Sequence, residues 1–246
     1  MNTPKILAVA AFVLFTTAAA WADSFADANA KYQAGDFKAA AAGYRSIIEG
    51  GSASVAVHYN LGNTEFRLGH KGKAMAAYLR ALELAPRDPD VRWNLHILKS
   101  VVQDRIEPAQ GGWPEWLSAQ AAWVTAREAA LAVAASLAAL AGFAFLALVF
   151  PPVRGALRLP RAAAFLLLLV SGAALYLRLG DEGEPRAVIL GREVYARYGP
   201  SLKETKAFTL HEGAEGRVLD QTKDWLFLRL SDRNAGWVPR DSCEIV

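Results

Sequence analysis

The 246-residue sequence predicts a multidomain membrane protein with an all-α repeat domain, a two-helix transmembrane hairpin and a small all-β barrel. Three observations support this prediction. A 34-residue period recurs near the N-terminus, two long apolar segments lie mid-chain, and short segments of alternating hydrophobicity fill residues 186–246. Hydrophobic residues make up 53% of the chain and charged residues 21%, which excludes a disordered chain and favours membrane association.

Residues 1–22 have the three parts of a secretory signal peptide. Lys5 supplies the positive charge, residues 6–15 the apolar stretch, and Ala20-Trp21-Ala22 the small residues of a cleavage site. We expect this segment to export the residues that follow. The alternative is an uncleaved N-terminal anchor.

The repeat is read from residues 29–44 and 63–78, which align at a spacing of 34. The matching pairs are Asn29 and Asn63, Gly35 and Gly69, Ala40 and Ala74, and Tyr44 and Tyr78. The second copy also has Leu61-Gly62, Ala81 and Pro86, and it resembles the tetratricopeptide repeat. Gly62 and Ala74 are expected to let paired helices approach closely, Tyr78 and Ala81 to fill the seam between repeats, and Pro86 to end the second helix.

The predicted repeat domain covers residues 23–103, with repeats at about 23–51 and 55–88 and a capping helix at 89–103. So short a stack needs support, which we expect from the Trp113–Trp123 segment, the membrane surface or a partner. The resemblance implies a groove for an extended peptide or a partner helix. Candidate binding residues are Asn29, Tyr59, Asn63, Phe66, Arg67 and Trp93, with Phe25, Tyr32 and Ile97 on the same face.

Three of the groove candidates carry polar groups that suit a peptide ligand. Asn29 and Asn63 could bond a peptide backbone, and Arg67 could meet a carboxylate. The alternative for the aromatic residues is ordinary packing between repeats.

Two apolar segments predict the transmembrane hairpin. Residues 129–150 carry no charge and would form about 33 Å of helix, enough for a hydrocarbon core of about 30 Å. Residues 162–179 form the second span, extended by the long side chains of Arg161 and Arg178. Residues 104–128 are the predicted linker, with interfacial Trp113, Trp116 and Trp123. The alternative is a buried hairpin in a soluble core.

Charge predicts the orientation of the hairpin. Arg154, Arg158 and Arg161 lie in the loop 151–161, and no acidic residue occurs from 129 to 180. Positive loops stay cytoplasmic, so both flanking modules are expected in the periplasm. The net charge of +3 is explained by this one loop, which argues against nucleic-acid binding.

Seven short strands are predicted after Pro185. They are 187–190, 193–197, 206–210, 216–221, 225–230, 236–239 and a short end near Ile245. Gly199-Pro200, Asp224-Trp225 and Gly236-Trp237-Val238-Pro239 give residues 186–246 a resemblance to a bacterial SH3 domain. That resemblance implies binding of peptides or cell-wall fragments, or an adaptor role. Candidate groove residues are Tyr195, Tyr198, Trp225 and Trp237, whose alternative role is structural.

No residue pattern predicts catalysis, a metal site or a cofactor. His58, His70, His96 and His211 have no metal-ligand spacing, and Cys243 is the single cysteine. Phosphate-binding glycine loops, dinucleotide motifs and nucleophile motifs are also missing from the sequence. We therefore do not expect an enzyme.

The order of modules resembles the BatE-type aerotolerance proteins. The resemblance implies a bacterial inner-membrane scaffold that works with von Willebrand A-domain membrane proteins and, indirectly, a MoxR-type AAA+ ATPase. Its expected role is oxidative or envelope stress tolerance. One alternative is a peptidoglycan-tethering protein that acts through the SH3-like domain. The other alternative is an enzyme. We also predict that the two exported modules form one composite surface.

Overall fold

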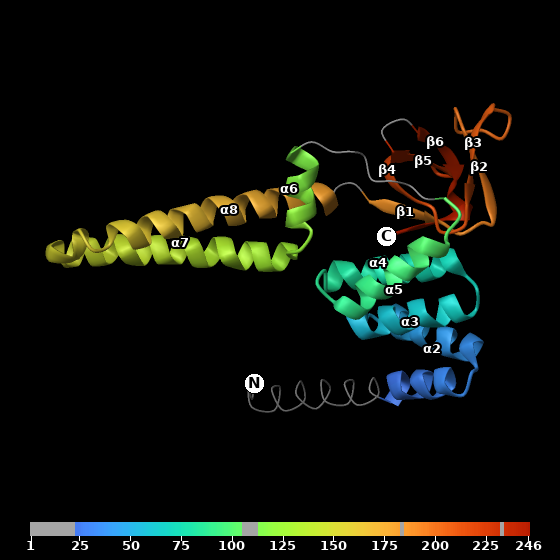
Figure 1. Cartoon of the computed structure of the whole chain (residues 1–246), viewed down its shortest axis with the longest axis horizontal. Helices are drawn as coiled ribbons and strands as arrows, with labels where there is room; N and C mark the ends of the chain where they lie inside the picture. The colour runs from blue at the N-terminus through green and yellow to red at the C-terminus, as the bar shows by residue number, and fades with distance from the viewer. Residues whose placement is uncertain (1–22, 105–112, 183–184, 232–233) are drawn as a thin grey trace, which may run out of the picture. The chain divides into compact units, whose positions relative to one another are not determined.

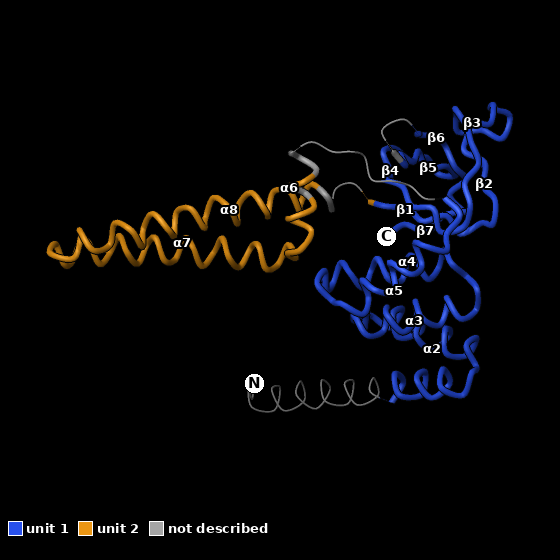
Figure 2. The backbone as a smooth tube through the Cα atoms, in the orientation of Figure 1, with its two compact units in different colours: residues 1–107, 186–246 blue, residues 108–185 orange. Residues whose placement is uncertain are grey.

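The computed structural model describes residues 23–104, 113–182, 185–231 and 234–246. The chain divides into two compact units (Figure 2). The first comprises residues 1–107 and 186–246 and contains the helical repeats and the β-sheet; the second comprises residues 108–185 and contains two long apolar helices. The predicted signal peptide, residues 1–22, lies outside the described residues.

The helical repeats follow the predicted period (Figure 1). After helical residues 23–33 come α2 (Phe37–Glu49), α3 (Val55–Arg67), α4 (Lys71–Leu84) and α5 (Pro89–Val101). Asp36, Ser54 and Asp88 cap α2, α3 and α5 by accepting hydrogen bonds from first-turn amides. Gly35 and Gly69 adopt φ of 80° and 82° in the turns that follow the first helix of each repeat, which explains why glycine recurs there.

Close helix packing within the second repeat depends on Gly62. A Cβ atom at this position would lie 2.5 Å from the ring of Tyr78, so no larger residue fits without a shift. Tyr78 is itself buried, as are Ala74 and Ala81 on the same helix. The packing roles predicted for these residues are therefore present.

The C-terminal module is an antiparallel sheet of seven strands in the described residues. They are β1 (Arg186–Ile189), β2 (Glu193–Arg197), β3 (Lys206–His211), β4 (Glu215–Gln221), β5 (Trp225–Ser231), β6 (Asn234–Pro239) and β7 (Cys243–Ile245), in the order β3-β2-β6-β5-β4-β1-β7. The predicted closed barrel is wrong, because β3 and β7 end this sheet without pairing to each other in the described residues. Instead, Asp104 accepts a hydrogen bond from the His211 amide of β3 at 2.6 Å, and Arg80 donates to the Ile245 carbonyl of β7 at 2.8 Å.

Strand β1 joins the helical repeats to the sheet. Its Val188 is fully buried in the helical core with Val91, Leu95 and Leu98, whereas Ala187 and Ile189 face the core of the sheet. The approach is close because Gly72 has no side chain: a Cβ atom there would lie 2.4 Å from the Ile189 carbonyl oxygen. The helical module and the sheet thus share one packed interface.

Polar contacts surround this joint. Glu212 Oε1 accepts a hydrogen bond from the Gly72 amide at 3.0 Å and so caps α4, whose own N-cap residue His70 makes no side-chain cap. Lys99 pairs with Glu215, and Arg80 pairs with Glu244. The predicted contact between the two modules is present. The repeat stack is supported by the sheet, which packs against α4. The sequence analysis had not named the sheet as this support.

The second unit is a hairpin of α7 (Ala126–Val149) and α8 (Arg158–Glu182), joined through the short helix η1 (Pro151–Arg154). α7 begins three residues before the predicted span because Thr125 and Glu128 form a capping box. Within the predicted linker, residues Trp113–Ala121 form helix α6, which contacts α8. Arg154 and Arg161 donate to the α7 carbonyls of Ala147 and Phe143 at 2.8 and 2.9 Å.

The hairpin buries small residues and exposes large apolar ones. The seam contains Ala129, Ser136 and Ala147 of α7 and Ala164 and Ser171 of α8. Leu148 and Leu159, by contrast, are 74% and 82% exposed. Both helices are long and apolar enough to cross a membrane.

We predict that Val188→Ala loosens α4 and α5 although Val188 lies on a strand. The variant leaves a cavity in the helical core, and its free energy of unfolding should fall by about 1 to 3 kcal/mol. Hydrogen exchange of α4 and α5 amides is the measurement. Val238→Ala, which alters the core of the sheet alone, is the matched control. Equal protection of α4 in both variants would contradict a shared core.

Candidate partner-binding surfaces

Asn29 and Asn63 form a hydrogen-bond ladder between repeats. The Tyr44 hydroxyl and the Asn60 amide donate to Asn29 Oδ1 at 2.6 and 3.0 Å. Thirty-four residues later, Tyr78 and Asn94 donate to Asn63 Oδ1 at 2.7 and 2.8 Å. Both predicted peptide-binding oxygens therefore already accept two internal bonds. The recurrence of Tyr44, Asn60, Tyr78 and Asn94 at the same period was the sequence signal that could have revealed this ladder.

The other groove candidates divide into packed and exposed residues. Tyr59 packs against the helical core, and its ring centroid lies 6.2 Å from that of Tyr78. Arg67 lies over the ring of Phe37 at 4.4 Å, a cation–π contact rather than an open carboxylate site. Phe66 and Trp93 are 38% and 64% exposed. These two side chains are the predicted aromatics that remain accessible.

Trp93 belongs to a continuous apolar stripe on α5. Ile97 and Val101 follow at spacings of four and eight residues, which places the three side chains on one face of the helix. All three are exposed. We call Trp93, Ile97 and Val101 the α5 ridge. Val101 was missed by the sequence analysis, although the four-residue spacing would have indicated it.

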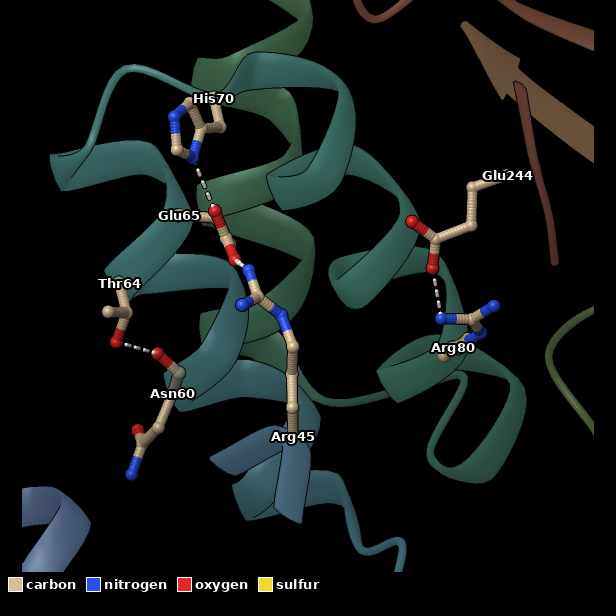
Figure 3. A network of polar contacts seen from close by, with 7 residues as sticks. All are labelled: Arg45, Asn60, Thr64, Glu65, His70, Arg80 and Glu244. Atoms are coloured by element: carbon tan, nitrogen blue, oxygen red, sulfur yellow. Dashed lines mark hydrogen bonds and ion pairs between the residues drawn. The ribbon is translucent and has the colours of Figure 1, made fainter. Parts of the chain in front are cut away.

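A buried carboxylate links the two repeats (Figure 3). Glu65 on α3 is 1% exposed and lies between Arg45 of α2, which pairs with Oε1, and His70, whose Nδ1 lies 2.7 Å from Oε2. Beside it, the Thr64 hydroxyl donates to the Asn60 carbonyl at 2.6 Å. Removing Arg45 would leave the buried Glu65 carboxylate without this charge partner, so the ion pair favours one alignment of α2 and α3.

The outer face of the sheet carries a second aromatic surface. Strand register places Trp237 opposite both Phe227 and Arg197, and the Phe227 and Trp237 ring centroids are 5.2 Å apart. Trp225 lies on the same face, whereas Leu226 and Leu228 point into the core. We call Trp225, Phe227 and Trp237 the aromatic strip. Phe227 was not among the predicted site residues, although it alternates with the core leucines.

The two candidate tyrosines differ in their surroundings. The Tyr195 hydroxyl donates to Glu193 at 2.7 Å, which raises the pKa of Tyr195, and Lys206 Nζ lies 3.3 Å from the ring centroid. Tyr198 follows β2 and is 72% exposed. The structure therefore places Trp225 and Trp237 on one face beside Phe227, and Tyr198 lies in the bend that follows β2.

Burial shifts the pKa values of two titratable groups in the first unit, Cys243 and His58. Burial raises the pKa of the Cys243 thiol to about 11, so this thiol is a poor nucleophile at neutral pH. Burial lowers the pKa of His58, and the positive charge of Arg80 lowers it further. No group of three or more His, Cys, Asp or Glu residues that could hold a metal ion occurs in the ranges that the structure describes.

Comparison with known families identifies one repeat of the helical module. Residues 55–88 match the family model of the tetratricopeptide repeat, the same range that we predicted for the second repeat. None of the curated proteins compared with the chain matches it. The repeat indicates a role in protein–protein interaction.

We predict that Asn63→Leu destabilises the repeats, because the buried Tyr78 hydroxyl loses its acceptor. The expected loss in free energy of unfolding is about 1 to 3 kcal/mol, measured by chemical denaturation. Lys73→Leu, at an exposed position on α4, is the control and should change stability little. Equal stabilities of the two variants would contradict a structural role for the ladder.

His58 should make stability dependent on pH. Its folded-state pKa lies below the ordinary value of 6.5, so the unfolded chain binds the proton more readily. The contribution of His58 to the free energy of unfolding is therefore fully present above pH 6.5 and is lost as the pH falls below that value. Thermal unfolding between pH 7.5 and about 5 tests this expectation. His58→Gln should flatten the slope and His96→Gln should not; equal slopes would disprove the assignment.

Proposed function

We propose that this protein is a non-catalytic membrane-anchored scaffold that presents its repeat and sheet modules to protein partners. The observation that carries the proposal is the shared core of the two modules, which fixes one surface while Phe66 and the α5 ridge stay exposed. A preorganised apolar ridge is suited to bind a partner helix or peptide, because little ordering entropy is lost on association.

The hairpin of α7 and α8 supports the membrane anchor in this proposal. Large apolar side chains on the outside and small residues in the seam are favourable in lipid and unfavourable in water. We propose the orientation given by Arg154, Arg158 and Arg161, with their loop in the cytoplasm and both other modules in the periplasm. A cleaved signal at residues 1–22 would give the same topology.

The finer identity is also a proposal. The order of repeats, hairpin and antiparallel sheet supports a BatE-type protein of the bacterial inner membrane, with an SH3-like C-terminal module. Its partners would be von Willebrand A-domain membrane proteins and, through them, a MoxR-type AAA+ ATPase. The process would be aerotolerance or envelope stress tolerance.

In-membrane crosslinking followed by mass spectrometry tests the scaffold. Phe66→Ala together with Trp93→Ala should reduce recovery of partner proteins at least tenfold, because accessible aromatic side chains supply much of the contact energy of protein interfaces. Leu84→Ala, an exposed apolar change elsewhere on the repeats, is the matched control. Unchanged recovery from a folded double variant would contradict binding through these helices.

The aromatic strip favours a second candidate function, in which the sheet tethers the protein to peptidoglycan. Aromatic rings such as Trp225 and Tyr198 can stack against sugar rings. Retention on washed sacculi, lost with Trp225→Ala and Tyr198→Ala but kept with Phe66→Ala and Trp93→Ala, would favour the tether over the scaffold.

A further inference from the structure

We propose that three arginines at the turn of the hairpin bind the phosphate group of an anionic phospholipid. They are Arg154 of η1 and Arg158 and Arg161 of α8, and we call them the turn arginines. The inference rests on the proposed membrane insertion of α7 and α8. It assigns a ligand to a segment whose positive charge otherwise explains only the orientation of the hairpin.

The turn arginines carry a positive charge that no acidic side chain of the hairpin can neutralise. No acidic residue occurs from 129 to 180. The nearest ones along the chain are Glu128 in the first turn of α7 and Asp181 in the last turn of α8, at the end of each helix that is far from the turn. Twenty-odd helical residues separate Glu128 from the turn by about 30 Å, which is too far for an ion pair. A counter-charge must therefore come from outside the hairpin.

The internal contacts of these arginines orient their guanidinium groups without neutralising them. Arg154 Nε donates to the Ala147 carbonyl at 2.8 Å, and Arg161 Nη2 donates to the Phe143 carbonyl at 2.9 Å. Both acceptors are neutral, and a guanidinium has five N–H donors, so donors remain for an anion. Arg158 is exposed and makes no hydrogen bond or ion pair within the residues that the structure describes.

The position of the turn favours a lipid as the source of the phosphate. Helix α7 has 24 residues and is about 36 Å long, so in a bilayer with a hydrocarbon core of about 30 Å its ends reach the headgroup layers. Only eight residues, 150–157, connect α7 to α8, so the turn stays within this layer. Lipid phosphates surround the turn there, whereas a soluble acidic protein has to displace them.

Charge favours an anionic lipid over a zwitterionic one. The phosphate of phosphatidylcholine is accompanied by a quaternary ammonium group of the same headgroup, which repels the arginines. Phosphatidylglycerol has no such cation. Arginine binds phosphate in bidentate fashion, and each basic residue near an anionic leaflet strengthens the attraction to it. The turn arginines should therefore select phospholipids of net negative charge.

Native mass spectrometry of the full chain tests this selection. The chain is equilibrated in nanodiscs that contain equal amounts of phosphatidylcholine and phosphatidylglycerol, and the lipids that stay bound after release are counted. Phosphatidylglycerol should be retained in excess, and less so after equilibration at high salt. Arg158→Gln should lower the ratio of bound phosphatidylglycerol to bound phosphatidylcholine roughly fivefold, and Arg158→Lys should keep most of it. The hairpin should persist in both variants, because Arg158 has no internal contact within the described residues.

Arg127→Gln is the matched control, because it removes an exposed arginine from the same hairpin at the start of α7. It should leave the lipid ratio unchanged. Equal loss in Arg127→Gln and Arg158→Gln, or equal retention of the two lipids by the unaltered chain, would overturn the proposal. Displacement of phosphatidylglycerol by inorganic phosphate or by soluble polyglutamate would also overturn it, in favour of a free-phosphate site or an acidic protein.

Two further results separate this inference from the proposed function. Failure of the chain to co-elute with nanodiscs would refute the membrane anchor and, with it, the lipid site. Selective retention of phosphatidylglycerol by a chain that recovers no partner in crosslinking would refute the scaffold and support the lipid site.

Discussion

The first unit depends on the burial of strand β1 on both faces. Val188 completes the helical core, while Ala187 and Ile189 complete the core of the sheet. A buried valine contributes about 1.5 to 3 kcal/mol, so one strand stabilises both modules at once. The short repeat stack gains a cover for α4, and the sheet gains protection near its edge strands. Each module supplies what the other lacks.

Two features let strand β1 pack closely against the repeats. Gly72 leaves room for the Ile189 carbonyl, and Glu212 accepts the hydrogen bond of the buried Gly72 amide in the first turn of α4. Gly72 and Glu212 lie 140 positions apart in the sequence, so the joint is built by both modules. This joint fixes the helical module and the sheet relative to each other.

The sequence pattern predicted local structure well and long-range contacts poorly. The 34-residue period gave the repeat helices, and alternation gave strands close to their final bounds. The apolar run Ala187-Val188-Ile189 indicates burial on both faces, but no local pattern names the helices that cover Val188. The barrel failed to close for a related reason, since the helical module supplies contacts at β3 and β7. Asn29 and Asn63 were interpreted as ligand groups because a periodic polar residue fits either a ligand or an internal ladder.

The end of that ladder explains where the accessible surface begins. Asn29 and Asn63 are followed at the same spacing by Ile97, which cannot accept a hydrogen bond, so the polar ladder stops at α5. The small, buried Ala28 and Gly62 are followed by the larger, exposed His96, which prevents another helix from approaching as closely as α4 approaches α3. Helix α5 is therefore built as the last helix of the stack. Its apolar ridge is available for a partner because the repeat pattern changes at these two positions.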